Sequence, residues 1–141
     1  MFVDACAIVA MMAGEDTAPA YAAALKAAPS PFTSPMAAWE AIIFLSRPDQ
    51  LDCRYSEAES AVVEWLDARN IELKEAASPR EVLSFAVDVA EKHGIGRRAL
   101  SNFDCFHYAH AKISGATLLT LDRLLQQTDA TTEPKSPNSA L

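Results

Sequence analysis

Short apolar runs alternate with longer helical patterns along the chain. Four runs favour strands: residues 1–9, where a strand turns into a helix, the Phe-Thr-Ser segment between Pro31 and Pro35, residues 71–74, and residues 116–121. Most of these runs are almost wholly apolar, which is typical of strands that are buried on both faces. The pattern therefore predicts several short strands in the interior of the protein.

The segments between these runs carry helix patterns and helix start signals. Ser56 with Glu59 three residues later has the form of a capping box, and the dipeptide Ser78-Pro79 is a typical helix start. Helices are expected at residues 17–28, 36–45, 56–70, 78–93 and 101–114. Strands that alternate with helices predict an α/β protein, a three-layer α/β/α sandwich with a central parallel sheet.

The size of the chain allows one domain. Its 141 residues, half of them hydrophobic by type, can form one sizeable core and are too few for two ordinary domains. After Asp129 the sequence turns to Thr, Pro, Ser and Asn, which bury too little apolar surface to order a segment. We therefore predict a domain over residues 1–130 and a flexible tail over residues 131–141.

The same sequence argues against a membrane protein. No apolar run approaches the ~18 to 20 residues of a membrane helix, and the start Met-Phe-Val-Asp lacks the basic flank of a signal peptide. Three widely spaced cysteines lack the paired spacing of a zinc site and are expected to be reduced. We expect a soluble, cytoplasmic protein.

The net charge limits how the chain can bind nucleic acid. A formal net charge of −7 opposes binding by overall charge, because nonspecific affinity comes mostly from Lys and Arg at phosphates. Any contact must be local, and an ordinary solvated surface is the alternative interpretation of the basic residues. The candidate patch consists of Lys92, His93, Arg97 and Arg98, with Lys112 and Arg123 as further members.

Four single acids stand within or directly after apolar segments. Asp4 and Asp122 follow the first and last predicted strands, and open α/β sheets bind ligands beyond the carboxyl ends of their strands. Glu40 has only apolar residues three and four positions away on its helix, so its carboxylate is expected to face inward. Asp104 lies in the first turn of its helix, where the dipole favours a negative charge and an anion can also be a ligand.

Carboxylates in apolar surroundings need a compensating charge. An unpaired buried carboxylate costs on the order of several kcal/mol, and no Lys or Arg stands beside Asp4 or Glu40 in the sequence. Oxygen ligands from separate elements suit Mg²⁺ or Mn²⁺, and such a site favours phosphodiester hydrolysis. We predict Asp4, Glu40 and Asp104 as metal ligands and Asp122 as a further catalytic acid. Taken singly, each acid also has an ordinary structural interpretation.

Other chemistries find less support. An aspartate phosphatase of the haloacid dehalogenase type needs a second Asp two residues after the first, and that position is Cys6. The sequence has no P-loop and no Gly-x-Gly-x-x-Gly. His107 and His110 are spaced three apart on one helix, but without a third ligand we interpret them as surface or packing residues.

The segments around the acids form a recognisable set. They are Phe2-Val3-Asp4-Ala5-Cys6-Ala7-Ile8, Ser34-Pro35 through Glu40, Asp104-Cys105-Phe106 with Tyr108-Ala109, and Leu118-Leu119 leading to Asp122 and Thr128-Asp129. This set resembles the PIN-domain ribonucleases, and specifically the VapC toxins of bacterial type II toxin-antitoxin pairs. The resemblance covers most of the chain.

The resemblance implies a fold, an activity and partners. It implies a PIN-like α/β/α fold, an endoribonuclease that depends on Mg²⁺ or Mn²⁺, a homodimer, and a co-expressed antitoxin that inserts a peptide near the active site. Asp4, Glu40 and Asp104 match the family's three core acids. Asp122 and Asp129 compete for the fourth position, because relatives often carry a Lys-Gly-x-x-Phe-x-x-Thr-Asp ending that this chain lacks.

Two departures from the family pattern keep a second interpretation open. Cys6 stands where relatives usually have Ser or Thr, and a thiol is the poorer hydrogen-bonding group. Before Asp104 the chain reads Leu-Ser-Asn-Phe, where close relatives commonly have Leu-Asn-Phe-Gly. The alternative is a catalytically weak PIN-like module that binds an antitoxin partner or RNA. A nuclease that acts on DNA would share the same site.

Overall fold

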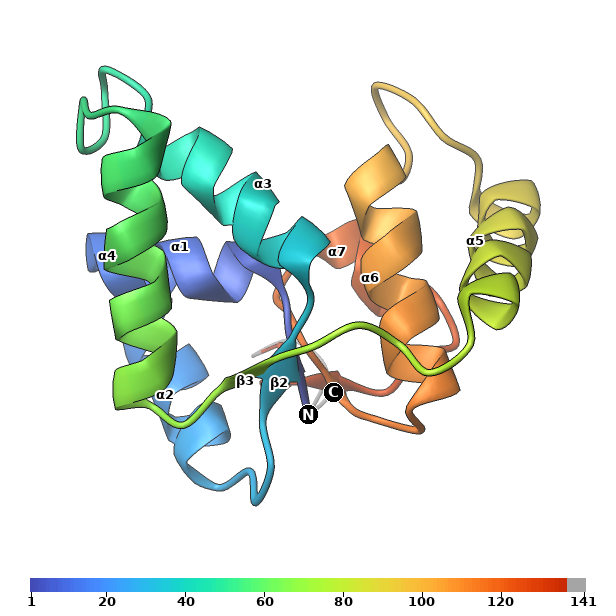
Figure 1. Cartoon of the computed structure of the whole chain (residues 1–141). Helices are drawn as coiled ribbons and strands as arrows, with labels where there is room; N and C mark the ends of the chain where they lie inside the picture. The colour runs from blue at the N-terminus through green and yellow to red at the C-terminus, as the bar shows by residue number, and fades with distance from the viewer. Residues whose placement is uncertain (137–141) are drawn as a thin grey trace.

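The chain forms a parallel sheet with helices on both of its faces (Figure 1). The computed structural model describes residues 1–136. The sheet has five strands in the order β3-β2-β1-β4-β5, and every neighbouring pair is parallel. The strands are β1 (Phe2–Val3), β2 (Phe32–Thr33), β3 (Glu72–Leu73), β4 (Leu118–Leu119) and β5 (Thr132–Glu133).

Two hydrophobic clusters lie on opposite sides of the sheet. Successive strand residues point to opposite faces, so Val3 and Leu119 pack in one cluster while Phe2 and Leu118 pack in the other. The first cluster is built mainly from α1 (Ala5–Ala13), α2 (Ala18–Lys26), α3 (Pro35–Leu45) and α4 (Tyr55–Ala68), and the second mainly from α5 (Pro79–His93), α6 (Asn102–Ile113) and α7 (Arg123–Gln126). This arrangement confirms the predicted three-layer α/β/α sandwich. Within residues 1–136, no helix combines the length and apolar character needed to cross a membrane.

Serine residues are the N-caps of three helices, α3, α5 and α6. Ser34 and Ser101 accept hydrogen bonds from backbone N–H groups three residues later, at 3.1 and 3.0 Å, and Ser78 does so at 3.4 Å. These caps satisfy N–H groups that have no partner within the helix. Because Ser34 and Ser101 directly precede α3 and α6, they also set where those helices start, and these two helices carry candidate acids.

The start of α4 differs from the sequence prediction. Arg54 is the N-cap, and the carboxylate of Glu57 accepts from the Arg54 backbone N–H at 3.1 Å and from its guanidinium at 3.1 Å. The predicted capping box of Ser56 and Glu59 is therefore wrong. Glu57 receives both a backbone hydrogen bond and an ion pair from Arg54, and this combination starts the helix at Tyr55.

The prediction of a flexible tail from residue 131 is wrong for its first residues. Thr132 and Glu133 form β5 at the edge of the sheet, where the N–H groups of Leu118 and Thr120 donate to the carbonyls of Thr131 and Glu133, each at 2.8 Å. An edge strand is held by backbone hydrogen bonds and needs little apolar side-chain burial, so composition did not reveal it. Residues 137–141 of the predicted tail lie outside the described residues.

Candidate active site

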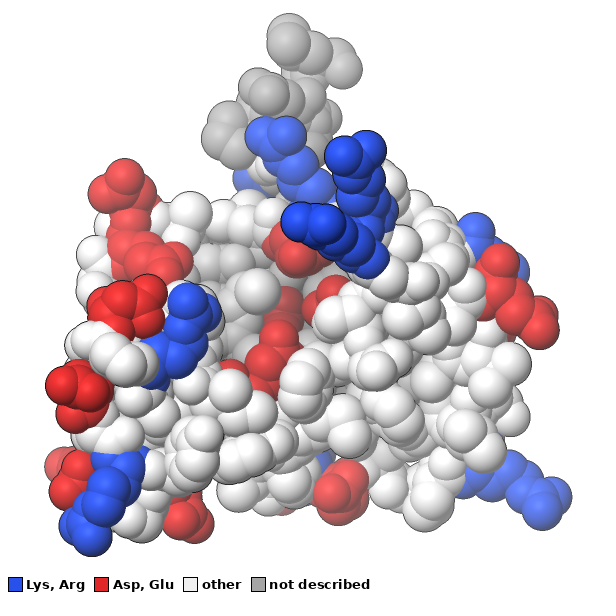
Figure 2. Space-filling model, turned by 90° about the horizontal axis from the view of Figure 1, so that it is seen from above, with Lys and Arg blue, Asp and Glu red and all other residues white. Residues whose placement is uncertain are grey.

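The four predicted acids meet beyond the carboxyl ends of the strands. Asp4 follows β1, Asp122 follows the segment that contains β4, Glu40 lies on α3 directly after β2, and Asp104 lies in the first turn of α6. The charges of Glu40 and Asp104 act on Asp4, and that of Asp122 acts on Asp104. The face seen from above in Figure 2 has acidic side chains in a central hollow and basic side chains along part of its rim.

Asp4 is the most buried of these acids. Its side chain caps α1 by accepting from the N–H of Cys6 at 3.4 Å, and the residue has no exposed surface. Burial raises the pKa of Asp4 to about 6, although the nearby His107 and the Thr120 hydroxyl lower it in part. Oδ2 of Asp4 has no hydrogen-bond partner among residues 1–136. The sequence therefore places a poorly compensated carboxylate at the centre of the site.

Asp104 and Asp122 each combine a helix cap with a place in the acidic cluster. Oδ2 of Asp104 accepts from the backbone N–H of Ser101 at 2.9 Å, and burial raises the pKa of Asp104 while the Ser101 hydrogen bonds oppose that rise. Oδ1 of Asp122 accepts from the N–H groups of Leu124 and Leu125 at 2.8 and 3.1 Å. In each carboxylate one oxygen forms the cap, and the other oxygen takes no part in the cap.

Glu40 is held by a histidine from another layer of the fold. Nε2 of His107 lies 2.6 Å from Oε2 of Glu40 and 3.8 Å from Oδ1 of Asp4. Burial lowers the pKa of His107, but the hydrogen bond to Glu40 and the charges of Asp4, Glu40 and Asp104 outweigh it, so the pKa is raised overall. His107 is thus the hydrogen-bond partner of Glu40, which the sequence around Glu40 does not reveal.

The donor set fits a divalent cation. Asp4, Glu40 and His107 each place one potential ligand atom within 4.8 Å of the others, and Asp4 offers an unpaired buried oxygen. No Lys or Arg forms an ion pair with any of the four predicted acids in the part of the chain that the structure describes. Carboxylate oxygens are hard ligands, and several of them together suit Mg²⁺ or Mn²⁺.

Comparison with known proteins agrees with this architecture. A family model of the PIN domain matches residues 1–130. The chain belongs to the PIN-domain family. The family predicted from the sequence motifs is thereby confirmed.

Solved structures share the fold of this PIN domain. The structure of VapBC-1 from nontypeable Haemophilus influenzae matches with a TM-score of 0.68 and 15% identity, over 94% of this chain and 95% of that one. The crystal structure of PAE2754 from Pyrobaculum aerophilum matches with a TM-score of 0.58 and 23% identity, over 92% of this chain and 85% of that one. At these identities the likeness shows the fold. No curated relative matches the chain by sequence.

Asp129, the other predicted candidate for the fourth acid, has different contacts. Its carboxylate accepts from the hydroxyl of Tyr108 at 2.6 Å and from the amino group of Lys112 at 3.2 Å. Both contacts lower the pKa of Asp129, with the Tyr108 hydrogen bond as the largest cause. Asp122, and not Asp129, is among the largest electrostatic influences on Asp104. The structure therefore places Asp122 with the acidic cluster and pairs Asp129 with the later turns of α6.

The predicted basic patch is divided. Arg97 and Arg98 are exposed in the loop between α5 and α6, which leads directly to the cap of Asp104. Lys112 is at the other end of α6, and its charge is paired with Asp129. The two arginines therefore precede the end of α6 that carries Asp104, whereas Lys112 lies at its other end.

Cys6 lines the same pocket as Glu40. Cys6 is exposed at the surface, but the protein atoms crowded around its thiol reduce its solvation. This loss of solvation, followed by the charge of Asp4, raises the pKa of Cys6, so the sulfur stays protonated and uncharged. In the turn after β4, the Thr120 hydroxyl accepts from the N–H of Asp122 at 3.1 Å, and the Tyr21 hydroxyl accepts from the N–H of Leu121 at 2.8 Å. These contacts orient the turn that carries Asp122.

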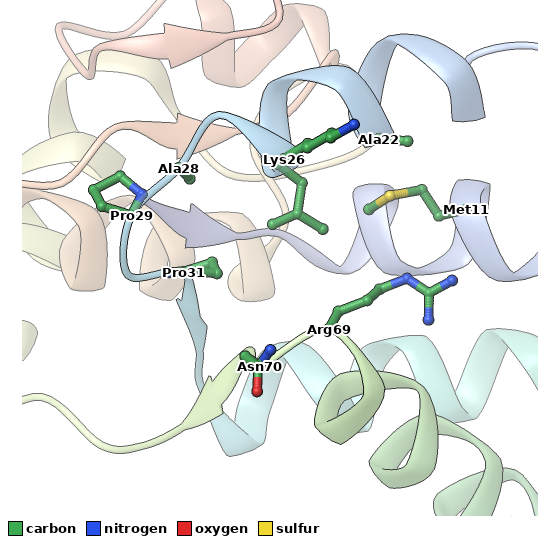
Figure 3. Close-up of a pocket in the computed structure, with 9 residues that line it drawn as sticks. Met11, Ala22, Lys26, Ala28, Pro29, Pro31, Arg69 and Asn70 are labelled. Atoms are coloured by element: carbon green, nitrogen blue, oxygen red, sulfur yellow. The ribbon is translucent and has the colours of Figure 1, made fainter.

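A second pocket lies at the opposite edge of the sheet (Figure 3). It is lined by residues that precede β2 and β3, among them Pro29, Pro31, Arg69 and Asn70, and by the ends of α1 and α2. The described residues that line it include no carboxylate. It has none of the chemistry of the acidic site.

Sequence reasoning missed the role of His107. Its spacing from His110 suggested a metal pair on one helix, which was set aside for want of a third ligand. The group that defines the role of His107 is Glu40, its hydrogen-bond partner, which is 67 positions away and therefore gave no local signal. His110, by contrast, stacks on Phe2 with ring centroids 5.7 Å apart, as expected for a packing residue.

Proposed function

We propose that this PIN domain is a metal-dependent endoribonuclease and the toxin of a type II toxin-antitoxin pair. The observation that carries the proposal is the convergence of Asp4, Glu40 and Asp104 at one edge of the sheet, where a buried Asp4 oxygen has no partner among the described residues. Mg²⁺ or Mn²⁺ would be held by these three carboxylates, with Asp122 beside them.

The chemistry follows from the ligands and their surroundings. A bound divalent ion supplies an activated water and neutralises charge on the scissile phosphate. Asp4 and Asp104 offer one free oxygen each, since their other oxygens cap α1 and α6. Arg97 and Arg98 are exposed in the loop before α6 and would contact RNA phosphates.

Partner proteins belong to the same proposal. VapBC-1 is the solved structure that gives the higher TM-score of the two described above, and its name supports a cognate antitoxin for this chain. Trp39 and Tyr55, whose rings are 5.6 Å apart, are 45% and 60% exposed and form apolar surface of the kind that protein partners cover. We infer a cytoplasmic homodimer that an antitoxin inhibits. Light scattering of the purified chain, alone and with the product of a neighbouring short reading frame, measures both associations.

Cleavage of total cellular RNA by purified, antitoxin-free protein tests the activity. We expect cleavage with Mg²⁺ or Mn²⁺, none with EDTA, and none with Asp4→Asn. Asp67→Asn, an exposed acid on α4, is the matched control and is expected to cut normally. A folded protein that binds the ion and cuts neither RNA nor DNA would contradict the proposal and favour the binding module. Cleavage of DNA but not of RNA would support the same metal site with DNA as its substrate.

A further inference from the structure

We propose that His107 is a positioning residue, whose Nε2–H holds one oxygen of Glu40 so that the other oxygen is available to the divalent ion. The inference rests on the proposed metal site and adds a residue that is not one of its acids. The distance of 2.6 Å between Nε2 and Oε2 is that of a strong, charge-assisted hydrogen bond. Without this contact the long, rotatable Glu40 side chain, about a quarter exposed, would sample several rotamers.

The direction of the hydrogen bond follows from the chemistry of the two groups. An ionised carboxylate can only accept hydrogen bonds, so Nε2 of His107 carries the hydrogen. Oε2 is committed to the imidazole, and Oε1 remains as the ligand atom of Glu40. The imidazole therefore acts on the metal through Glu40.

The surroundings of the ring favour this role over direct metal binding. His107 has no exposed surface, and its ring packs near those of Phe2 and Phe103, with centroids at 5.8 and 6.4 Å. Nδ1 has no hydrogen-bond partner among residues 1–136. If Nε2 bound the ion, Nδ1 would carry a buried N–H without an acceptor, whereas histidines that bind metals usually donate that proton to a nearby oxygen. With the hydrogen on Nε2, Nδ1 leaves only an unpaired lone pair.

Binding of Mn²⁺ to the purified full chain tests the proposal without using activity. Free Mn²⁺ is counted by electron paramagnetic resonance during a titration, for the unaltered chain and for His107→Ala and His107→Gln. We expect His107→Ala to weaken Mn²⁺ binding about 10- to 100-fold, and His107→Gln, which keeps an N–H donor, to restore most of the loss. His110→Ala removes a buried histidine from the same helix without touching Glu40 and is expected to bind normally.

The same samples separate positioning from ligation. Pulsed electron paramagnetic resonance of the Mn²⁺-loaded chain is expected to show no strong coupling to a histidine nitrogen, because His107 contacts Glu40 and not the ion. A strong nitrogen coupling that disappears in His107→Gln would overturn the proposal, since it would make His107 a ligand. His107→Phe fills the ring space without a donor, so it replaces His107→Ala if that variant does not fold.

The remaining outcomes distinguish this inference from the proposed function. Unchanged Mn²⁺ affinity in folded His107→Ala or His107→Phe, together with lost affinity in Asp4→Asn, would overturn the role of His107 and leave the metal site in place. A folded, unaltered chain that binds no Mn²⁺ would overturn both. Binding that follows the expected order among the variants supports the positioning role even if the chain cuts no RNA.

Discussion

The imidazole of His107 on α6 lies 2.6 Å from the carboxylate of Glu40 on α3 and links the two helical layers of the protein at the site. Oδ1 of Asp4 lies 3.8 Å from the same imidazole nitrogen. Two carboxylates therefore share one nitrogen, and this shortage of positive charge supports the proposed cation site at this edge of the sheet.

Replacement of Asp4 by Asn is expected to stabilise the metal-free protein while it abolishes cleavage. Burial raises the pKa of Asp4 to about 6 in the folded chain, against about 3.9 for an unfolded Asp. Because the pKa is higher in the folded chain, protonation of Asp4 favours the folded state. This stabilisation is complete below pH ~4 and is lost as the pH rises through about 6. In EDTA, Asp4→Asn should melt roughly 3–8 °C higher than the unaltered chain at pH 7.5, and the difference should shrink toward pH 4. Equal melting temperatures of the two chains at pH 7.5 would show that ionised, buried Asp4 does not destabilise the fold.

Asp122 and Asp129 should differ in their effects on cleavage. Asp122→Asn keeps a side chain that can cap α7 but removes a charge from the acidic cluster, so cleavage should fall roughly tenfold or more. Asp129→Asn changes a group tied to Tyr108 and Lys112, and cleavage should be unchanged. Single-turnover rates on one RNA substrate compare the two variants. The reverse order would assign the fourth acid to Asp129.

The arginine loop should contribute to RNA affinity, and Lys112 should not. Arg97 and Arg98 are exposed beside the start of α6, whereas the amino group of Lys112 is 3.2 Å from Asp129. The double change Arg97→Gln and Arg98→Gln should weaken RNA binding and reduce the slope of log affinity against log salt by about 1 to 2. Binding is measured in the Asp4→Asn background to prevent cleavage. Lys112→Gln is the control, and an equal loss in that variant would place the RNA elsewhere.

Cys6→Ser should increase the rate of cleavage severalfold. Cys6 shares a pocket with Glu40, and its protonated thiol is a weaker hydrogen-bond donor and acceptor than a hydroxyl of similar size. A serine in this place can orient a carboxylate or a water that the thiol holds poorly. Cys6→Ala, which has neither group, should be no faster than the unaltered chain. A slower Cys6→Ser variant would show that the thiol suits this site.

Removal of β5 should destabilise the fold. A chain that ends at Ala130 loses the acceptors of the Leu118 and Thr120 N–H groups, and both residues are fully buried. A buried donor left without a partner costs about 1–3 kcal/mol, so the melting temperature should fall by roughly 5 °C or more. Glu133→Gln keeps the backbone of β5 and should melt normally. If the truncated chain were as stable as the full chain, residues 131–133 would contribute nothing to the stability of the fold.

Much of the fold was predictable because its signals are local. The apolar runs at residues 1–9 and 116–121 led to β1 and β4, and Ser34 and Ser78 mark helix starts that their own hydrogen bonds determine. Asp4 and Glu40 stood out because each is the single acid in an apolar segment. Periodicity and caps act over a few residues, so one sequence contains all the information that they require.

Contacts between distant segments decided the rest. The sequence by itself determined the α/β class, most of the helices and strands, and the candidate acids, since these depend on neighbours in the chain. Only the tertiary structure paired His107 with Glu40, tied Asp129 to Lys112 and added β5 to the sheet. A histidine next to an acid 67 positions away and an edge strand bonded through its backbone leave no periodic trace, because the energy of each contact depends on a partner that folding brings near.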